Sequence, residues 1–277
     1  MELTIVADSK LVKKMNAQIM GAFRIAFEDN HIKVIEDMYK DNSHHGMRHT
    51  TDLIKNAKKL VIALKKEAEI DWKVLAMSII LHDVYVEDDK KKQETARHGR
   101  EAVNLFNMYF KDDFTETQRK KIVDAIGTHD DKSKQNVGCR DKLCLEAKIL
   151  YDVDNLDAFG IKGFYRYVSI YTVKEIPYDK ILYNVGNRYK TLNFDISRTM
   201  GRKDYEQIRL LCQKYNDNRD TEVSHIIGFI AENHKKTPIH IASDAIQLKS
   251  YVPGSWDPRR TFSGFFEELL RIYSKKD

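Results

Sequence analysis

Hydrophobic residues recur along this chain at helical spacing. One series, spaced by four, comprises Leu11, Met15, Ile19, Phe23 and Phe27. Another, spaced by three or four, comprises Leu53, Ala57, Leu60, Val61 and Leu64. Such spacing places apolar side chains on one face of a helix. Alternating strand patterns with Asn-Gly or Asp-Gly turns are missing. The pattern therefore predicts an all-α fold, a helical bundle of about a dozen helices.

Helix boundaries are marked as well. No proline precedes Pro177, which permits long uninterrupted helices. The residues Thr115 to Gln118 form a capping-box pattern that predicts a helix over 115–130. Apolar spacing also predicts helices over 49–66 and 147–160.

The amino-acid composition changes near residue 220, and this change predicts that the chain is divided into two parts. We expect a main domain over 1–219 and a C-terminal helical appendage over 220–277, with helices at 221–233 and 262–274. The last helix carries an apolar stripe that either docks on its own domain or closes a homo-oligomer.

Composition and charge narrow the class of protein. The chain has 277 residues and a net charge of +5, which is too mild to indicate a nucleic-acid partner but suits a phosphate-bearing substrate. Its three cysteines lack CxxC spacing, which is typical of thiols in a reducing compartment. No apolar signal core or run of about 18 apolar residues is present. We expect a cytoplasmic protein with no membrane partner.

The most apolar stretch, VLAMSIILHDV over 74–84, ends in His82 and Asp83. A carboxylate carried into a core is costly unless it is paired or coordinated. An imidazole beside it suits a bound metal ion. Taken alone, the pair is equally compatible with the C-terminus of a helix at which the charged residue is exposed to solvent.

Two other polar residues also lie next to apolar helical positions. His49 begins the predicted helix over 49–66, and Asp154 lies on an otherwise apolar helical face. Together with His82 and Asp83 they form a mixed nitrogen and oxygen set. Such a set suits Mn²⁺, Fe²⁺, Co²⁺, Ni²⁺ or Zn²⁺ better than Mg²⁺ or Ca²⁺, and it leaves positions open for water and substrate.

This arrangement resembles the HD-domain superfamily of metal-dependent phosphohydrolases, whose pattern is H…HD…D on a helical bundle. The likeness covers about residues 25–215. It implies that the metal ligands are His49, His82, Asp83 and Asp154. It also implies hydrolysis of a phosphate ester or anhydride by a metal-activated water.

One bacterial branch, of single-domain nucleotide pyrophosphohydrolases, is the most similar. The strings DNLDAFG over 154–160 and KTLNFDISRTMGRKDYEQIRLL over 190–211 carry that likeness. In this branch a glutamate after HD orients the active-site water, and Glu94 matches it. The sequence over 82–85 is also similar to the HDxxY turn of small-molecule HD hydrolases.

Two further branches are less similar. Cyclic-nucleotide phosphodiesterases have YHNxxHA before HD, whereas this chain has HHGMRHT over 44–50, a departure that leaves His45 as a candidate general acid. The ppGpp hydrolases place Glu-Asp soon after HD, and here Glu87 and Asp88 come one residue late.

Further residues are candidates for the chemistry. Asp83 is a candidate base as well as a ligand, and Glu94 is a second base or water orienter. Phosphate chemistry needs positive charge near the reacting group. The candidate substrate contacts are Arg97, His98, His129 and Lys148, of which the two histidines are also candidate ligands of a second metal.

The leading hypothesis is a metal-dependent phosphohydrolase acting on a nucleotide or a related phosphate ester. A phosphodiesterase acting on a cyclic nucleotide or a dinucleotide is the second reading within this class. A di-iron oxygenase on the same scaffold belongs to a different class and would use His98 and His129 as extra ligands. A non-catalytic regulatory domain is a third class, against which the complete ligand set argues.

Overall fold

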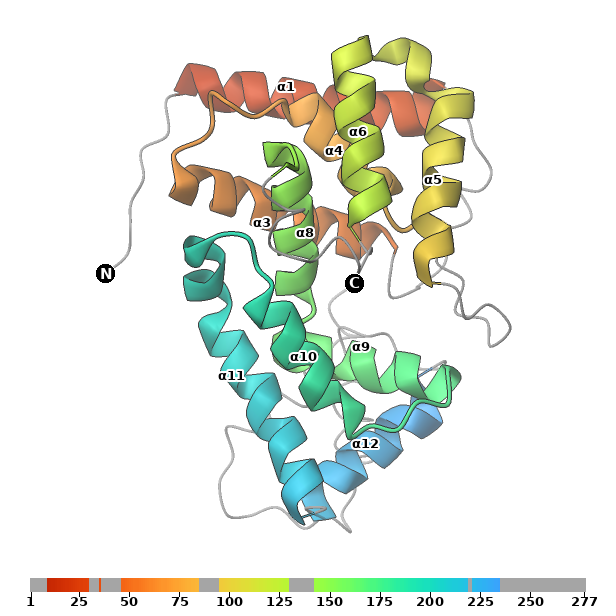
Figure 1. Cartoon of the computed structure of the whole chain (residues 1–277), viewed down its shortest axis with the longest axis vertical. Helices are drawn as coiled ribbons and strands as arrows, with labels where there is room; N and C mark the ends of the chain where they lie inside the picture. Colours follow the sequence, from red (N-terminus) through yellow and green to blue (C-terminus); the bar gives the residue numbers. More distant parts are fainter. Residues whose placement is uncertain are drawn as a thin grey trace, which may run out of the picture. The chain divides into compact units, whose positions relative to one another are not determined.

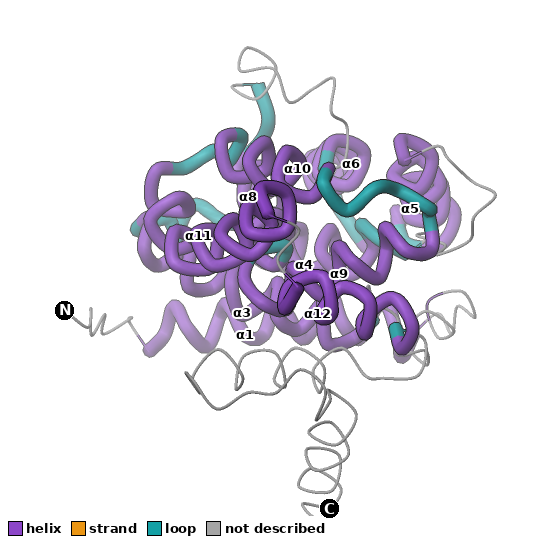
Figure 2. The backbone as a smooth tube through the Cα atoms, turned by 90° about the horizontal axis from the view of Figure 1, so that it is seen from below, coloured by secondary structure: helices purple, strands orange, loops and turns teal. Residues whose placement is uncertain are grey.

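A computed structural model describes residues 9–29, 35, 46–84, 95–129, 142–218 and 221–234. Ten α-helices lie in these ranges, which contain no strand (Figures 1 and 2). The predicted all-α fold is therefore confirmed. None of the described helices is long and apolar enough to cross a membrane.

The chain folds into two compact units. The first unit comprises Met1–Glu87, Lys91–Asn155 and Thr191–Thr199, and the second comprises Asp88–Lys90, Leu156–Lys190 and Met200–Asp277. The division predicted near residue 220 stays a prediction, because residues 235–277 lie outside the described ranges.

Helix α4 forms the centre of the first unit. This helix spans Trp72–Leu81, and every residue except Lys73 is buried. It packs against α1, α3 and α6. Figure 1 shows α1 and α3 running across this unit and α5, α6 and α8 running along another direction. The helical elements of this unit besides α4 are α1 (Ser9–Arg24), the π-helix η1 (Ile25–Asp29), α3 (Met47–Leu64), α5 (Thr95–Tyr109), the short η2 (Lys111–Asp113), α6 (Glu116–Thr128) and α8 (Leu145–Asp157).

The first turns of α4 and α6 follow from local sequence signals. Asp71 caps α4, since its side chain accepts hydrogen bonds from the backbone N–H groups of Lys73 and Val74. Thr115 and Gln118 form the predicted capping box of α6. The helices predicted over 49–66, 115–130 and 147–160 are thus present as α3, α6 and α8, with ends shifted by a few residues.

The second unit is built around α9. Its helices are α9 (Gly160–Val173), α10 (Lys180–Lys190), α11 (Asp195–Asn218), which begins in the first unit, and α12 (Thr221–Asn233). Most of α9 is buried, and it packs against α12. The helix predicted over 221–233 is confirmed as α12, whereas the one predicted over 262–274 lies outside the described residues.

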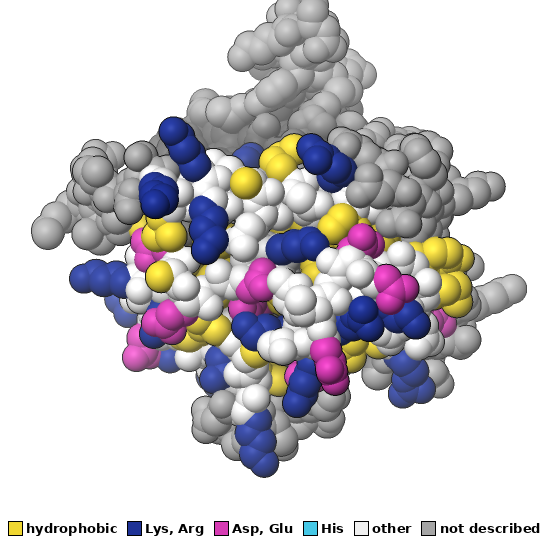
Figure 3. Space-filling view, turned by 90° about the horizontal axis from the view of Figure 1, so that it is seen from above, with side chains coloured by type: hydrophobic (Ala, Val, Ile, Leu, Met, Phe, Trp, Pro, Cys, Tyr) yellow, Lys and Arg dark blue, Asp and Glu magenta, His cyan; other side chains and the backbone are white. Residues whose placement is uncertain are grey.

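Charged side chains of both signs are present on the described part of the surface. On the face shown in Figure 3, Lys and Arg side chains lie among acidic and hydrophobic ones. This mixture agrees with the mild net charge of +5.

Candidate metal centre

Four side chains from three helices meet in the first unit. His49 comes from α3, His82 and Asp83 from the C-terminal end of α4, and Asp154 from α8. One ligand-type atom of each lies within 4.8 Å of those of the others. The first three residues are buried and Asp154 is half-buried. The structure thus brings together the four residues that the sequence singles out, in the single such group within the described ranges.

The separations between these atoms are equal to or somewhat larger than those around a bound metal ion. His82 Nε2 lies 3.1 Å from Asp83 Oδ2 and 3.9 Å from Asp154 Oδ1. His49 Nε2 lies 3.5 Å from each of the same two oxygens. Ligand atoms about 2.1 Å from one ion lie about 3.0 Å apart at neighbouring octahedral positions and about 3.4 Å apart at tetrahedral ones. One ion could therefore contact all four residues with little rearrangement.

The orientation of His82 is fixed by its own helix. Its Nδ1 lies 2.8 Å from the carbonyl oxygen of Ile79 and must donate, because a carbonyl only accepts. The other nitrogen, Nε2, therefore points into the cluster. This atom is buried and has no hydrogen-bond partner of acceptable geometry among the described residues. Metal-binding histidines commonly donate their second N–H to a carbonyl in this way, so the ring fits a metal ligand.

The electrostatics of the cluster favour a positive charge at His82. Burial lowers the pKa of this imidazole, but the carboxylates of Asp83 and Asp154 outweigh burial and raise the pKa to about 10. Carboxylates that hold a proton this strongly attract a divalent cation at the same place. The buried His/Asp group could therefore hold a divalent metal ion.

A polar network joins the N-terminal parts of α4, α6 and α8. Glu146, in the first turn of α8, accepts hydrogen bonds through Oε1 from the backbone N–H of Asp71 at 3.1 Å and from Lys121 Nζ at 2.8 Å. Gln118, in the first turn of α6, donates to Asp71 Oδ2 at 2.7 Å. Helices α4, α6 and α8 therefore begin together and run in the same direction towards the cluster.

This parallel arrangement affects the field at the site. Helix α4 ends at Leu81 with His82 as its C-cap, and α6 ends at Thr128 with His129 as its C-cap. The C-terminal end of a helix carries a partial negative charge. Two such ends meet at the cluster and add to the attraction of its carboxylates for a cation.

A second carboxylate on α8, Asp152, has a structural role. It is buried and accepts hydrogen bonds from Asn193 N at 2.7 Å, Asn193 Nδ2 at 2.8 Å and Phe194 N at 3.1 Å. Burial raises the pKa of Asp152, and these donors counteract that effect only in part. The residue joins α8 to the segment that begins α11, a role we did not predict. Its position as a polar residue in an apolar run was the only signal.

The remaining candidate residues differ in their placement. His129 Nε2 lies 3.6 Å from Asp83 Oδ1, and its ring centre is 5.0 Å from that of His82. Lys148 is half-buried on α8, six residues before Asp154 and thus about 120° around the helix from it.

Four other candidates are not fully described. Arg97 and His98 belong to the first turn of α5, and their side chains lie outside the description. His45 and Glu94 lie outside the described residues altogether. The catalytic and substrate-binding roles of all four stay predictions.

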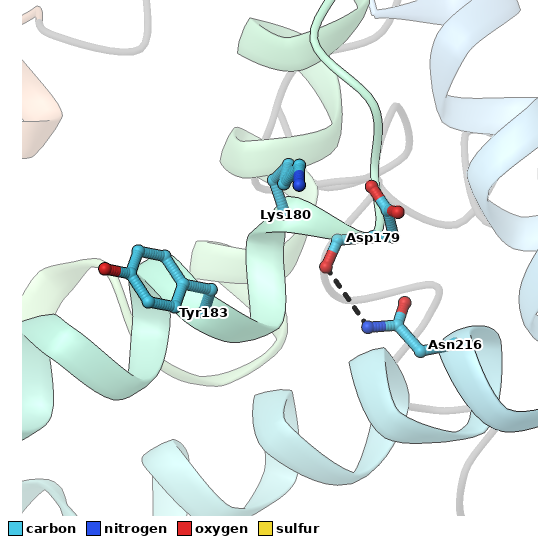
Figure 4. A pocket seen from close by; sticks show the side chains of 4 residues that line it. All are labelled: Asp179, Lys180, Tyr183 and Asn216. Atoms are coloured by element: carbon cyan, nitrogen blue, oxygen red, sulfur yellow. Dashed lines mark hydrogen bonds between the residues drawn. The ribbon is translucent and has the colours of Figure 1, made fainter.

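The second unit contains a surface cavity of a different kind. It has a volume of about 460 Å³ and is lined by Asp179, Lys180, Tyr183 and Asn216 (Figure 4). Asn216 Nδ2 donates to the carbonyl oxygen of Asp179 at 3.1 Å. The cavity wall has no histidine among these residues, unlike the cluster in the first unit.

Comparison with known proteins adds a limited likeness. No protein-family model and no curated protein matches the chain. It is similar to crystal structures of Bacillus subtilis YpgQ. The one in complex with ADP is 13% identical with a TM-score of 0.45, and another of YpgQ is 14% identical with a TM-score of 0.44; each comparison covers 76% of this chain and 98% of YpgQ. Similarity at this level supports no conclusion about function. The helical fold and the buried cluster agree with what the sequence predicts for the fold class and for the four candidate ligands.

Proposed function

We propose that this chain is an HD-type metal-dependent phosphohydrolase that acts on a nucleotide or a related phosphate ester. The observation that carries this proposal is the cluster of His49, His82, Asp83 and Asp154, with a buried imidazole nitrogen aimed into it. Two imidazoles and two carboxylates suit Mn²⁺, Fe²⁺, Co²⁺, Ni²⁺ or Zn²⁺. Four protein ligands leave coordination positions open on a six-coordinate ion.

The metal ion, Asp83 and His129 have separate roles in the proposed reaction. When bound, the ion supplies Lewis-acid activation of a water molecule and of a phosphoryl oxygen. Asp83 faces His49 and His82 with Oδ2, whereas Oδ1 faces His129. In this proposal Oδ1 accepts a proton from the water. His129, when protonated, can donate through Nε2 to a phosphate oxygen.

Residues outside the cluster complete the proposed site. The resemblance to the nucleotide pyrophosphohydrolase branch supports Glu94 as the residue that orients the water. His45 would protonate the leaving group. The positive charges needed to bind the substrate phosphates would come from Arg97, His98 and Lys148.

A metal-dependent oxygenase is the second candidate function. The placement of His129 favours it, because its Nε2 lies 3.6 Å from Asp83 Oδ1 and would supply a further nitrogen ligand beside the cluster. A two-iron site needs such an additional nitrogen ligand.

Metal analysis combined with a substrate screen tests the proposal. The purified chain would be loaded with Mn²⁺, Mg²⁺, Co²⁺ or Ni²⁺ and assayed against nucleoside mono-, di- and triphosphates and cyclic nucleotides. We expect phosphate or pyrophosphate release with a transition metal, and loss of both metal and activity in His82→Ala. His225→Ala is the matched control, because His225 is exposed on α12 in the second unit. Two irons per chain with oxygen uptake and no hydrolysis would replace the hydrolase with the oxygenase.

A further inference from the structure

Gly99 lies in the first two turns of α5, where that helix meets the C-terminal end of α6. The residue is buried, and a β-carbon placed on it would lie 3.2 Å from the carbonyl oxygen of Ile126 and 3.7 Å from His129 Cε1. The first of these distances is tighter than an ordinary van der Waals contact and involves backbone, which cannot rotate away. The close approach of the two helices therefore depends on the missing side chain.

The carbonyl oxygen of Ile126 is also the group that orients His129. His129 Nδ1 lies 2.6 Å from that oxygen and must donate to it, so Nε2 is turned towards Asp83 Oδ1 at 3.6 Å. The peptide that a side chain at position 99 would press on is thus the same peptide that holds the imidazole. A shift of a few tenths of an ångström there moves the ring relative to the carboxylate.

We propose that Gly99 is a positioning residue for His129. It lets α5 lie against the end of α6 and thereby fixes the imidazole with Nε2 facing Asp83. The positioning of His129 by Gly99 is independent of the proposed function. Only the expected effect of Gly99 on activity rests on the proposed function.

The contact can be tested first without any substitution. In the chain with ¹⁵N- and ¹³C-labelled histidine, we expect a nuclear Overhauser effect between the α-protons of Gly99 and the Hε1 proton of His129. We also expect a His129 ring with the proton on Nδ1. Absence of the Overhauser effect, or a proton found on Nε2 alone, would overturn the proposal.

A pair of glycine substitutions separates positioning from general helix stability. In Gly99→Ala we expect the His129 Nδ1–H signal to shift or disappear. Gly127→Ala is the matched control on the facing helix, because a β-carbon there would meet only Val103 Cγ2, at an ordinary 3.8 Å. The control should keep the signal. An unchanged signal in Gly99→Ala would contradict the proposal.

Activity supplies the last readout. If the hydrolase screen succeeds, we expect Gly99→Ala to lower kcat/KM by about 10-fold or more, since small misplacements of a reacting group are costly. The same substitution should have no further effect in a His129→Ala background, because it acts through that ring. Equal losses in both backgrounds would overturn the proposal. If the screen finds no activity, the ring signals still decide the positioning.

Discussion

Asp152 and Asp154 lie two residues apart on α8, yet they have different tasks. Two residues correspond to about 200° around a helix, so the carboxylates leave on nearly opposite sides. Asp154 faces His49 and His82, whereas Asp152 accepts three hydrogen bonds from Asn193 and Phe194. The same residue type thus supplies a candidate ligand on one side and a structural anchor on the other.

Replacing Asp152 tests whether this residue has a structural role. In Asp152→Asn one acceptor oxygen becomes an NH₂ group that faces N–H donors. We expect the free energy of unfolding at pH 7 to fall by about 1–3 kcal/mol, the cost of leaving buried partners unsatisfied. Urea denaturation followed by circular dichroism measures the change.

The control for this variant is an exposed aspartate. Asp112 is 85% exposed and lies 3.4 Å from Arg119, so Asp112→Asn should change stability by less than about 1 kcal/mol. Equal effects of the two substitutions would show that Asp152 is no anchor.

At the scale of elements, the network at the start of α4, α6 and α8 sets where the other ends of these helices meet. Asp71 is central, because it caps α4 and also contacts both neighbours. Its side chain accepts from Lys73 N, Val74 N and Gln118 Nε2, and its backbone N–H donates to Glu146.

Removing the cap should weaken α4 and the cluster together. We expect Asp71→Ala to lower the free energy of unfolding by about 1–2 kcal/mol, the usual cost of losing an N-cap. Asp71→Asn is the control, since its side-chain oxygen can still cap the helix and only the hydrogen bond from Gln118 to Oδ2 is lost. Thermal unfolding of the wild type and the two variants measures their order of stability. The idea fails if the alanine and asparagine variants are equally stable.

The ion pair between Lys121 and Glu146 makes the network sensitive to alkaline pH. Burial lowers the pKa of Lys121, but Glu146 outweighs burial and raises it above the ordinary 10.5. A raised lysine pKa contributes stability that is complete below 10.5 and is lost as pH rises through the higher value in the folded protein.

The wild type should therefore exceed Lys121→Met in stability by a constant amount near neutral pH, and by less above pH 10.5. Urea unfolding of both proteins across this range measures the difference. Lys120→Met, at an exposed neighbouring position, controls for loss of a lysine in general. A difference that grows with pH would refute the assignment.

The sequence predicts elements better than it predicts the contacts between them. Apolar periodicity and caps are local, so α3, α4, α6 and α8 and the inward residues His49, His82 and Asp154 can be recognised. Glu146 and Asp71 are 75 residues apart, and Asn193 and Asp152 are 41 apart. Such pairs depend on how helices pack, which no local pattern encodes. The closeness of Gly99 to His129 belongs to the same class.

At the scale of the whole molecule, the four clustered residues all belong to the first of two compact units. A ligand that binds only the folded state stabilises it by mass action. Bound metal should therefore act on the elements that supply the cluster, which are α3, α4 and α8. Helices α10 and α12 of the second unit contribute no residue to it.

Metal binding should consequently protect the two units unequally. With Mn²⁺ at about 100 times its dissociation constant, we expect a gain of about 2.7 kcal/mol in the first unit. Amide hydrogen exchange measured by mass spectrometry would show slower exchange in α3 and α4, and little change in α10 and α12. His82→Ala should abolish the effect, whereas His225→Ala should keep it. Equal slowing in both units would mean that they unfold as one, and no slowing at all would count against the metal site.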